Sequence, residues 1–220
     1  MGIFNAEAAE HAVGHATGDT QLLILLILAL PLAGFLLTGI FGRRMGDRPW
    51  IISVAAILAA TALATVLAFQ SLNGDFGELG VEFTLYTWIP AGALVVDVGF
   101  LVDNLTALVL IVVTWIGSLV HIYSIGYMAH DPGKWRFFAY LTLFMFSMLL
   151  LVLTSSYLVL FGAWELVGLS SYLLIGFWYT KRAPALASKK AFLTNRVADH
   201  SFLVGIIGIW LITGTMDIQE

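Results

Sequence analysis

The 220-residue chain contains no cysteine and few charged residues, and both shortages narrow what it can do. Without thiolates it cannot form a disulfide or hold zinc or an iron–sulfur cluster through cysteine, so we expect no metal and no redox cofactor in this chain. Only 11% of its residues are charged and 60% are hydrophobic, against about 25% and about 45–50% in soluble proteins. Its ten basic residues are scattered, which argues against a nucleic-acid partner. The composition predicts a polytopic membrane protein.

Six apolar stretches are long enough to cross about 30 Å of hydrocarbon as helices. We expect them at 21–41, 50–70, 101 or 103 to 123, 136–154, 157–179 and 189–213. Residues 21–70 thus hold the first two helices, residues 101–213 hold the last four, and residues 214–220 start the next connection. The predicted fold class is an all-α polytopic membrane protein with six transmembrane helices.

Residues 71–100 break this pattern, because they contain no helix-length apolar run. A polar turn at 73–75 comes first, and 81–86 then alternates apolar and polar residues with the period of a half-exposed strand. A turn at 90–93 leads into a second apolar segment at 94–100. We therefore predict a β-hairpin between the second and third helices, in a loop on the outer face of the membrane.

The basic residues predict the orientation of the helices. Nine of the ten Lys and Arg residues fall on the first, third and fifth connections, and none falls on the second or fourth. Six consecutive crossings require this alternation under the positive-inside rule. We therefore expect a multi-pass protein of the bacterial cell membrane, with the basic connections in the cytoplasm and both ends of this segment outside.

The tail at 1–20 lies on the outside in this topology. It has no basic residue and no signal-peptide pattern, so we interpret it as mature sequence. It carries His11 and His15 beside several acidic residues. A metal-binding arm is the alternative to a solvated tail, which is the interpretation we favour.

Glu165 is the one charged residue of the fifth predicted helix. An acid inside such a helix costs about 2.5–3.5 kcal/mol on insertion scales, so it requires a partner or a water-filled surrounding. It could be satisfied by a single hydroxyl or backbone group, but ionisable residues inside membranes mark ion pathways. Glu165 is therefore the first functional candidate. His121, near the end of the third helix, is either satisfied by hydrogen bonds or part of a proton relay.

The sixth predicted helix opens with two lysines and carries Arg196, Asp199 and His200 further in. Spacings of three and four residues let these three share one helix face, and we expect Asp199 to pair with Arg196. Such a pair can simply fix helix packing, and the alternative is a proton pathway together with Glu165. The lysines fit ordinary snorkelling residues at the inner boundary, and Lys190 is also a candidate for the pathway.

Several runs of the sequence resemble one family. They are Trp-Arg-Phe-Phe-Ala-Tyr-Leu at 135–141, the apolar run at 144–153, Trp164-Glu165 followed by Gly-Leu-Ser-Ser-Tyr at 168–172, Lys-Lys-Ala-Phe at 189–192 and Asn-Arg-Val-Ala-Asp at 195–199. These runs strongly resemble the antiporter-like membrane subunits. That family includes subunit L of the proton-pumping NADH–quinone oxidoreductase, respiratory complex I, and the large subunit of multisubunit cation/proton antiporters. The resemblance is dense over residues 103–214.

The resemblance implies roles for three residues. Glu165 matches the family's essential fifth-helix glutamate, and Arg196 and Asp199 match its sixth-helix charged pair. Ser170 stands where cysteine is frequent and Ala198 replaces a usual glycine, and neither change touches the charges. Family members have many more helices, so the resemblance implies an N-terminal portion, with the lysine partner of Glu165 beyond the last residue.

The function implied by the resemblance is that of a membrane-arm subunit of a proton-pumping NADH–quinone oxidoreductase, which translocates protons through buried charges and has no redox centre of its own. FMN, iron–sulfur clusters and quinone are implied on other subunits. The implied partners are the other membrane-arm subunits of complex I, the lipid bilayer and protons. Two alternatives stay open, namely the large subunit of a multisubunit cation/proton antiporter and a non-transporting membrane scaffold.

Overall fold

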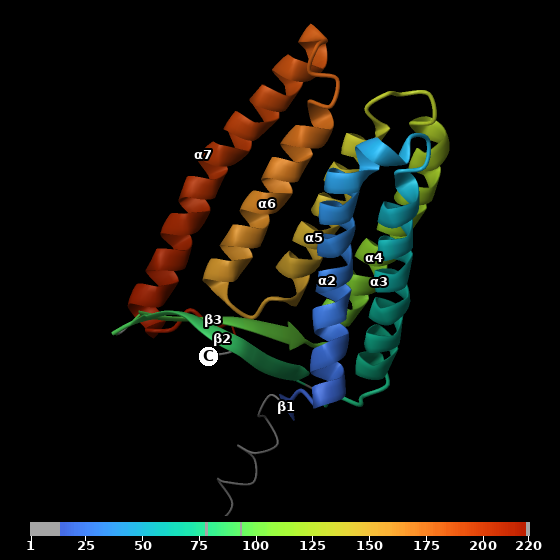
Figure 1. Ribbon diagram of the computed structural model, residues 1–220. Coiled ribbons are helices and arrows are strands. Elements are labelled where there is room, and N and C mark those ends of the chain that lie inside the picture. The colour runs from blue at the N-terminus through green and yellow to red at the C-terminus, as the bar shows by residue number, and fades with distance from the viewer. Residues whose placement is uncertain (1–13, 78, 93, 219–220) are drawn as a thin grey trace, which may run out of the picture.

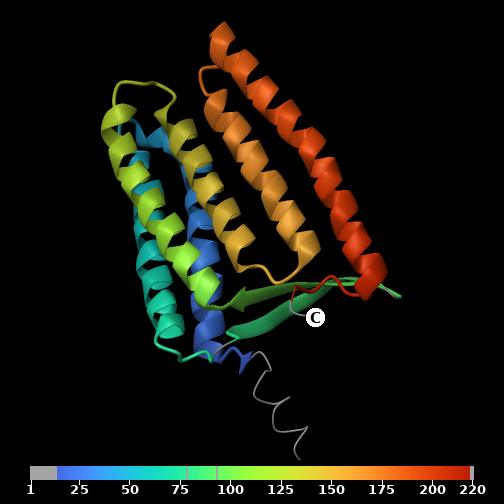
Figure 2. The same ribbon diagram turned by 180° about the vertical axis from the view of Figure 1, so that it is seen from behind.

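The computed structural model describes residues 14–77, 79–92 and 94–218. Within them, six helices are long and apolar enough to cross a membrane. They lie side by side, with a small sheet across one end of the bundle (Figures 1 and 2). The predicted fold class, an all-α membrane protein with six transmembrane helices and a β-hairpin, is confirmed. The helices are α2 Gly18–Phe41, α3 Trp50–Leu72, α4 Asn104–Tyr127, α5 Lys134–Leu153, α6 Tyr157–Ile175 and α7 Arg182–Thr213, and the strands are β1 Gly14–His15, β2 Val81–Ala91 and β3 Leu94–Val102.

The helices form two groups. The first, which we call the four-helix block, consists of α2, α3, α4 and α5, with α2 in contact with both α3 and α5. The second, which we call the α6–α7 layer, packs through α6 against α5 and ends with α7 at the edge of the molecule (Figure 1). α7 has 32 residues and α6 has 19, so α7 is roughly 20 Å longer.

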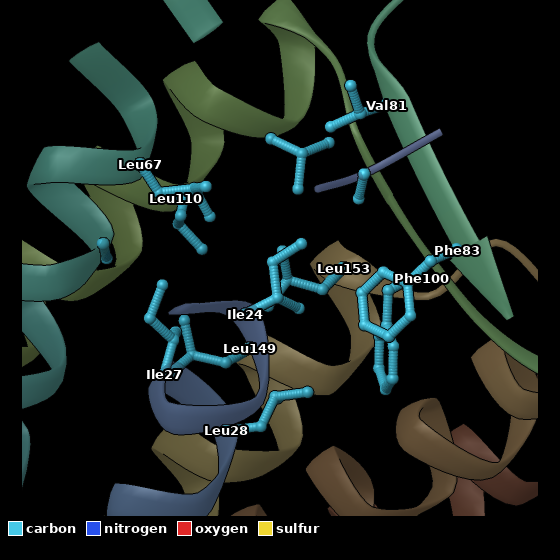
Figure 3. Packing of buried hydrophobic residues seen from close by; sticks show 13 residues of the cluster. Ile24, Ile27, Leu28, Leu67, Val81, Phe83, Phe100, Leu110, Leu149 and Leu153 are labelled. Atoms are coloured by element: carbon cyan, nitrogen blue, oxygen red, sulfur yellow. The ribbon is translucent and has the colours of Figure 1, made fainter. Parts of the chain in front are cut away.

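A hydrophobic cluster joins the four-helix block to the sheet (Figure 3). It contains Ile24 and Ile27 of α2 and Leu149 of α5, all fully buried, and it extends to Phe83 of β2 and Phe100 of β3. The two phenylalanine ring centroids are 5.4 Å apart. Between helices in hydrocarbon such packing acts by van der Waals contact, because lipid tails are as apolar as leucine. At the sheet it also removes apolar surface from water.

Small and hydroxyl-bearing residues let the helices of the block approach closely. An ideal Cβ built on Gly34 of α2 would lie 2.8 Å from the Cβ of Ala56 in α3, so a larger residue would push the two helices apart. Between α3 and α4, the hydroxyl oxygens of Thr61 and Ser118 are 2.7 Å apart and form a buried hydrogen bond. Neutral contacts therefore hold the block together.

The hairpin has the predicted position. β2 and β3 pair antiparallel from Val81 opposite Val102 to Ala91 opposite Leu94, with two irregularities of register. The strands are longer than predicted, since β3 continues past residue 100. Asp103 then caps α4, and its carboxylate accepts a hydrogen bond from the backbone N–H of Thr106 at 2.6 Å. The third predicted helix therefore starts at the later of its two expected positions.

The end of the predicted tail is structured. His15 belongs to β1, which adds to the hairpin by pairing in parallel with the start of β2. α2 begins at residue 18 because Thr17 caps it, its side-chain oxygen accepting a hydrogen bond from the N–H of Thr20 at 3.4 Å. The prediction of a tail that continues through residue 20 is therefore wrong at its end. His11 lies outside the described residues.

The connection between α6 and α7 is shorter than predicted. Residues expected in a loop at 180–188 form about the first two turns of α7, which begins at Arg182. Pro184 is tolerated there because the first N–H groups of a helix have no intrahelical partner. α6 ends four residues before the expected position, and Gly176 donates its backbone N–H to the carbonyl of Tyr172 at 2.9 Å.

The three basic connections lie at the end of the bundle opposite the sheet (Figure 1). They contain Arg43 in the short helix η1 (Gly42–Met45), Lys134 at the start of α5 and Lys181 before α7. Lys134 joins two of them, because its Nζ donates a hydrogen bond to Asp47 at 2.8 Å. This bond and the lysine charge hold the pKa of the Asp47 carboxyl below its usual value of 3.8. Which end of the bundle faces the cytoplasm stays a prediction.

Candidate functional site

Four of the five candidate residues meet between α6 and α7, near the middle of both helices. They lie along a groove of about 400 Å³ that is lined by Phe161, Glu165, Arg196, Asp199, His200 and Leu203. The fifth candidate, Lys190, is exposed and lies six residues before Arg196, which places it about 9 Å nearer the basic end of α7. The fold therefore does not bring Lys190 to the groove.

Arg196 and Glu165 form an ion pair across the two helices. The Nη1 group of Arg196 donates to Oε2 of Glu165, and the guanidinium carbon lies 4.8 Å from the ring centroid of Phe192. The second carboxylate oxygen, Oε1, is buried and has no hydrogen-bond partner among the described residues. One oxygen of Glu165 is thus held by a cation, and the other is available for a second partner.

Asp199 has a different partner from the one predicted. It is 7% exposed, and its Oδ1 accepts a hydrogen bond from the indole Nε1 of Trp164 at 2.8 Å. Because Arg196 pairs with Glu165, the predicted ion pair between Arg196 and Asp199 is wrong. Each acid of the groove therefore has one partner on the opposite helix.

The antiparallel arrangement of α6 and α7 explains this exchange of partners. Trp164 comes directly before Glu165 on α6, and Asp199 comes three residues after Arg196 on α7, on nearly the same face. In antiparallel helices the earlier residue of one faces the later residue of the other, so Trp164 meets Asp199 and Glu165 meets Arg196. Two neighbouring side chains on α6 thus fix one turn of α7.

The two candidate histidines occupy different places. His200 is exposed beside the groove, and its Nδ1 lies 2.6 Å from the backbone carbonyl oxygen of Arg196. His121 is fully buried on α4, and its Nδ1 lies 2.8 Å from the carbonyl oxygen of Gly117. It lines a separate apolar cavity of about 260 Å³ between α4 and α5. Of the two, only His200 belongs to the charged groove.

Trp164 is the site residue that sequence reasoning about charge does not find. Its indole donates to a buried carboxylate, and its ring also packs edge-on against Phe202 with centroids 5.9 Å apart. The available signal was its position next to Glu165 within the motif. For the alternative of a metal-binding arm, the described residues contain no group of three or more His, Asp or Glu side chains that could hold a metal ion, and His11 is not among them.

The fold and the groove define a class: a polytopic membrane subunit with a charged cluster between two neighbouring helices. Two family models match the chain, and together they cover more than half of it. Residues 88–138 match the model described as NADH-ubiquinone oxidoreductase (complex I), chain 5 N-terminus. Residues 154–220, which contain the whole groove, match NADH:quinone oxidoreductase/Mrp antiporter, TM.

Curated relatives agree with these matches. The chain is 46% identical over 191 residues to the NADH-quinone oxidoreductase subunit L of Mycobacterium tuberculosis, an alignment that covers 87% of this chain and 30% of the relative. It is 43% identical over 187 residues to the subunit L of Neisseria meningitidis serogroup A, covering 84% of this chain and 27% of the relative. Among solved structures, the Mrp complex from Dietzia sp. matches with a TM-score of 0.72 and 25% identity, covering 90% of this chain and 20% of that chain.

The chain belongs to the family of antiporter-like membrane subunits that includes those of NADH–quinone oxidoreductases and Mrp antiporters. The resemblance found in the sequence is therefore confirmed. The chain spans less than a third of the length of either curated relative.

Proposed function

We propose that this chain forms part of a membrane-arm subunit of a proton-pumping NADH–quinone oxidoreductase in a bacterial cell membrane, with the ends of this segment outside. The observation that carries the proposal is the Glu165–Arg196 ion pair between two membrane-spanning helices, inside the region that matches the family model. An ionisable pair at this depth marks an ion pathway. FMN, iron–sulfur clusters and quinone belong to other subunits in this proposal, and the neighbours of the chain are further membrane-arm subunits.

Glu165 acts as the switching carboxylate. Its Oε2 is bound to Arg196, whereas its Oε1 has no partner among the described residues. A second cation that approaches Oε1 favours the charged carboxylate, and its withdrawal favours the neutral acid. By the resemblance, this second cation is a lysine on a helix beyond residue 220. Movement of that lysine therefore makes Glu165 release or take up a proton.

The other candidate residues near Glu165 have separate roles in this proposal. Asp199 is held at a fixed depth by the indole of Trp164. His200 lies exposed beside it, and imidazole is the side chain that exchanges protons most readily near neutral pH. His200 thus passes protons between Glu165 and water, and Lys190 supplies positive charge nearer the basic end of the pathway.

The test is Glu165→Gln in the full-length subunit within the assembled complex, reconstituted into vesicles. Glutamine keeps the volume and can accept the hydrogen bond from Arg196, but it cannot titrate. We expect normal subunit assembly and loss of the NADH-driven pH gradient. The matched control is Asp75→Asn, which removes a carboxylate from an exposed position and should leave the gradient unchanged. Wild-type pumping by Glu165→Gln would refute the mechanism.

The same vesicles separate the alternatives. The likeness to the Mrp complex is the observation that favours a cation/proton antiporter, and the higher identity to subunit L favours the oxidoreductase. An antiporter subunit should convert an imposed sodium gradient into a pH gradient without NADH. A non-transporting scaffold should show the same assembly and the same pumping in the wild type and in Glu165→Gln.

A further inference from the structure

A second cavity, which several charged and polar side chains line, lies at the basic end of the bundle, apart from the charged groove. It has a volume of about 300 Å³, and its chemistry comes from Arg136, Tyr140, Tyr172, Tyr179, Ser188 and Lys189. These residues come from the start of α5, the end of α6, the α6–α7 connection and the start of α7. The cavity is therefore built at the point where the four-helix block meets the α6–α7 layer.

The cavity contains two cations and no acid. Arg136 and Lys189 line it, and the other lining residues are uncharged. Among the described residues, neither cation takes part in an ion pair. Asp131, in the turn before α5, is already engaged: its two carboxylate oxygens accept hydrogen bonds from the Gly133 N–H at 2.7 Å and the Trp178 indole at 2.8 Å. The two cations that line the cavity therefore have no ion-pair partner among the described residues.

The guanidinium of Arg136 is held in place by two aromatic rings. Its central carbon lies 5.4 Å from the ring centroid of Phe177 and 5.3 Å from that of Tyr179. Contact with ring faces fixes the guanidinium plane by cation–π attraction and leaves its N–H groups able to donate. A guanidinium held in this way presents a planar fork of N–H donors. This fork matches the oxygens of a phosphate group better than it matches a spherical anion.

The cavity also lies at the level of a membrane surface. α7 has 32 residues, or about 48 Å of helix, which exceeds the roughly 30 Å of hydrocarbon. Its first turns, which carry Ser188 and Lys189, therefore extend into the interfacial layer. Trp178 and Tyr179 are exposed at this end, as expected for residues of the aromatic belt. Lipid phosphates lie at this depth.

We propose that this cavity binds a phosphate group, supplied by the headgroup of an anionic phospholipid of the leaflet at the basic end. Arg136 and Lys189 neutralise the phosphate, and the tyrosine hydroxyl groups donate hydrogen bonds to its remaining oxygens. Basic pockets between transmembrane helices on the cytoplasmic side bind such headgroups. The bound lipid links the block to the α6–α7 layer. The proposal does not depend on proton transport by Glu165.

The experiment uses the assembled complex that contains this chain, delipidated in detergent and titrated with phosphatidylglycerol. Bound lipid is counted by native mass spectrometry. The variants are Arg136→Gln and Lys189→Gln, and the matched controls are Arg182→Gln and Lys181→Gln, which remove the same charges from exposed positions outside the cavity. Loss of one charge-assisted contact should weaken binding about tenfold in either variant and leave both controls at wild-type affinity.

Two further arms identify the source of the phosphate. Inorganic phosphate should fail to compete at millimolar concentration, and phosphatidylcholine should bind more weakly than phosphatidylglycerol. Competition by inorganic phosphate would overturn the lipid source and assign the site to a free phosphate. Equal lipid binding by the wild type, the two variants and the two controls would overturn the proposal. Lys189 is exposed at the surface, so Lys189→Gln gives a readout even where Arg136→Gln prevents folding.

Discussion

The four-helix block and the α6–α7 layer cross the same membrane but are held together differently. Apolar packing and neutral hydroxyl pairs such as Thr61–Ser118 hold the block. In the layer, an ion pair and an indole–carboxylate bond add to the apolar packing around Ile206. In the most apolar part of α3, 44% of residues are buried, against 11% in α7. Among the described residues, the charges thus lie in the layer that has fewer packed neighbours.

Breaking the ion pair in the layer should have the largest effect. Arg196→Gln leaves Glu165 without its cation, and loss of one partner of a buried pair costs about 3–5 kcal/mol. Both side chains are partly exposed, at 37% for Arg196 and 20% for Glu165, so we expect about 1–3 kcal/mol here. The level of membrane-assembled subunit should fall, and proton pumping should be lost.

The double variant Glu165→Gln and Arg196→Gln is the matching control. It removes both charges, so assembly should recover toward the wild-type level while pumping stays absent, because a pair removed together leaves no uncompensated charge. Quantitative immunodetection of the assembled complex, beside proton transport in vesicles, measures both quantities. Equal assembly of the single and double variants would show that Arg196 and Glu165 are not energetically coupled.

The partner of Arg196 marks the limit of what the sequence could predict. The spans and the hairpin follow from hydropathy and from a period of two, which are properties of one segment at a time. The spacing of Arg196 and Asp199 shows that they share a helix face, but it contains no information on how the neighbouring helix is rotated. That rotation brings Glu165 to the arginine and Trp164 to the aspartate.

Helix ends were harder to predict than helix positions for a related reason. Hydropathy places the apolar middle of α7, whereas its polar first turns from Arg182 onward resemble a loop in composition. Local hydrogen bonding decides such ends, as it does at Gly176 after α6. Other ends depend on pairing between distant segments, since β1 forms by pairing with the edge of β2. Neither contact leaves a trace in hydropathy.

Removing the acceptor of Trp164 should have the next largest effect. Asp199→Ala leaves the indole N–H without its partner, at a cost of about 1–3 kcal/mol. Asp199→Asn can still accept the bond and should assemble close to the wild-type level. In a Trp164→Phe background, Asp199→Ala should lower the level of assembled subunit less than it does in the wild type, so that the two changes are non-additive. Additive losses of assembled subunit would indicate that the bond between Asp199 and Trp164 contributes nothing.

The same glycine-to-alanine change should act in opposite directions in the two regions. In the block, a Cβ on Gly34 would lie 2.8 Å from that of Ala56, and overpacking of this kind costs about 1–3 kcal/mol. Better helix propensity returns about 1 kcal/mol, so Gly34→Ala should lower the melting temperature slightly. In α6, a Cβ built on Gly168 would meet nothing within 4 Å, and Gly168→Ala should raise the melting temperature. Destabilisation by Gly168→Ala in the assembled complex would show that another helix packs there.

The smallest effect should come from the ion pair between Lys134 and the exposed Asp47 at the basic end of the block. Lys134 lowers the pKa of Asp47 in the folded protein, so the pair stabilises the fold fully above the unfolded pKa of about 3.9 and loses its effect as the pH falls through the lower folded value. The difference in melting temperature between the wild type and Asp47→Asn should thus stay constant from about pH 7 to 5 and shrink below about pH 4.

Added salt should reduce this difference in melting temperature at every pH, because exposed charges are screened. The Asp47 side chain is 95% exposed, so loss of its charge should leave the packing of the block unchanged, whereas loss of Arg196 alone should disturb the layer. A difference that grows on acidification would mean that Lys134 does not stabilise the charged form of Asp47.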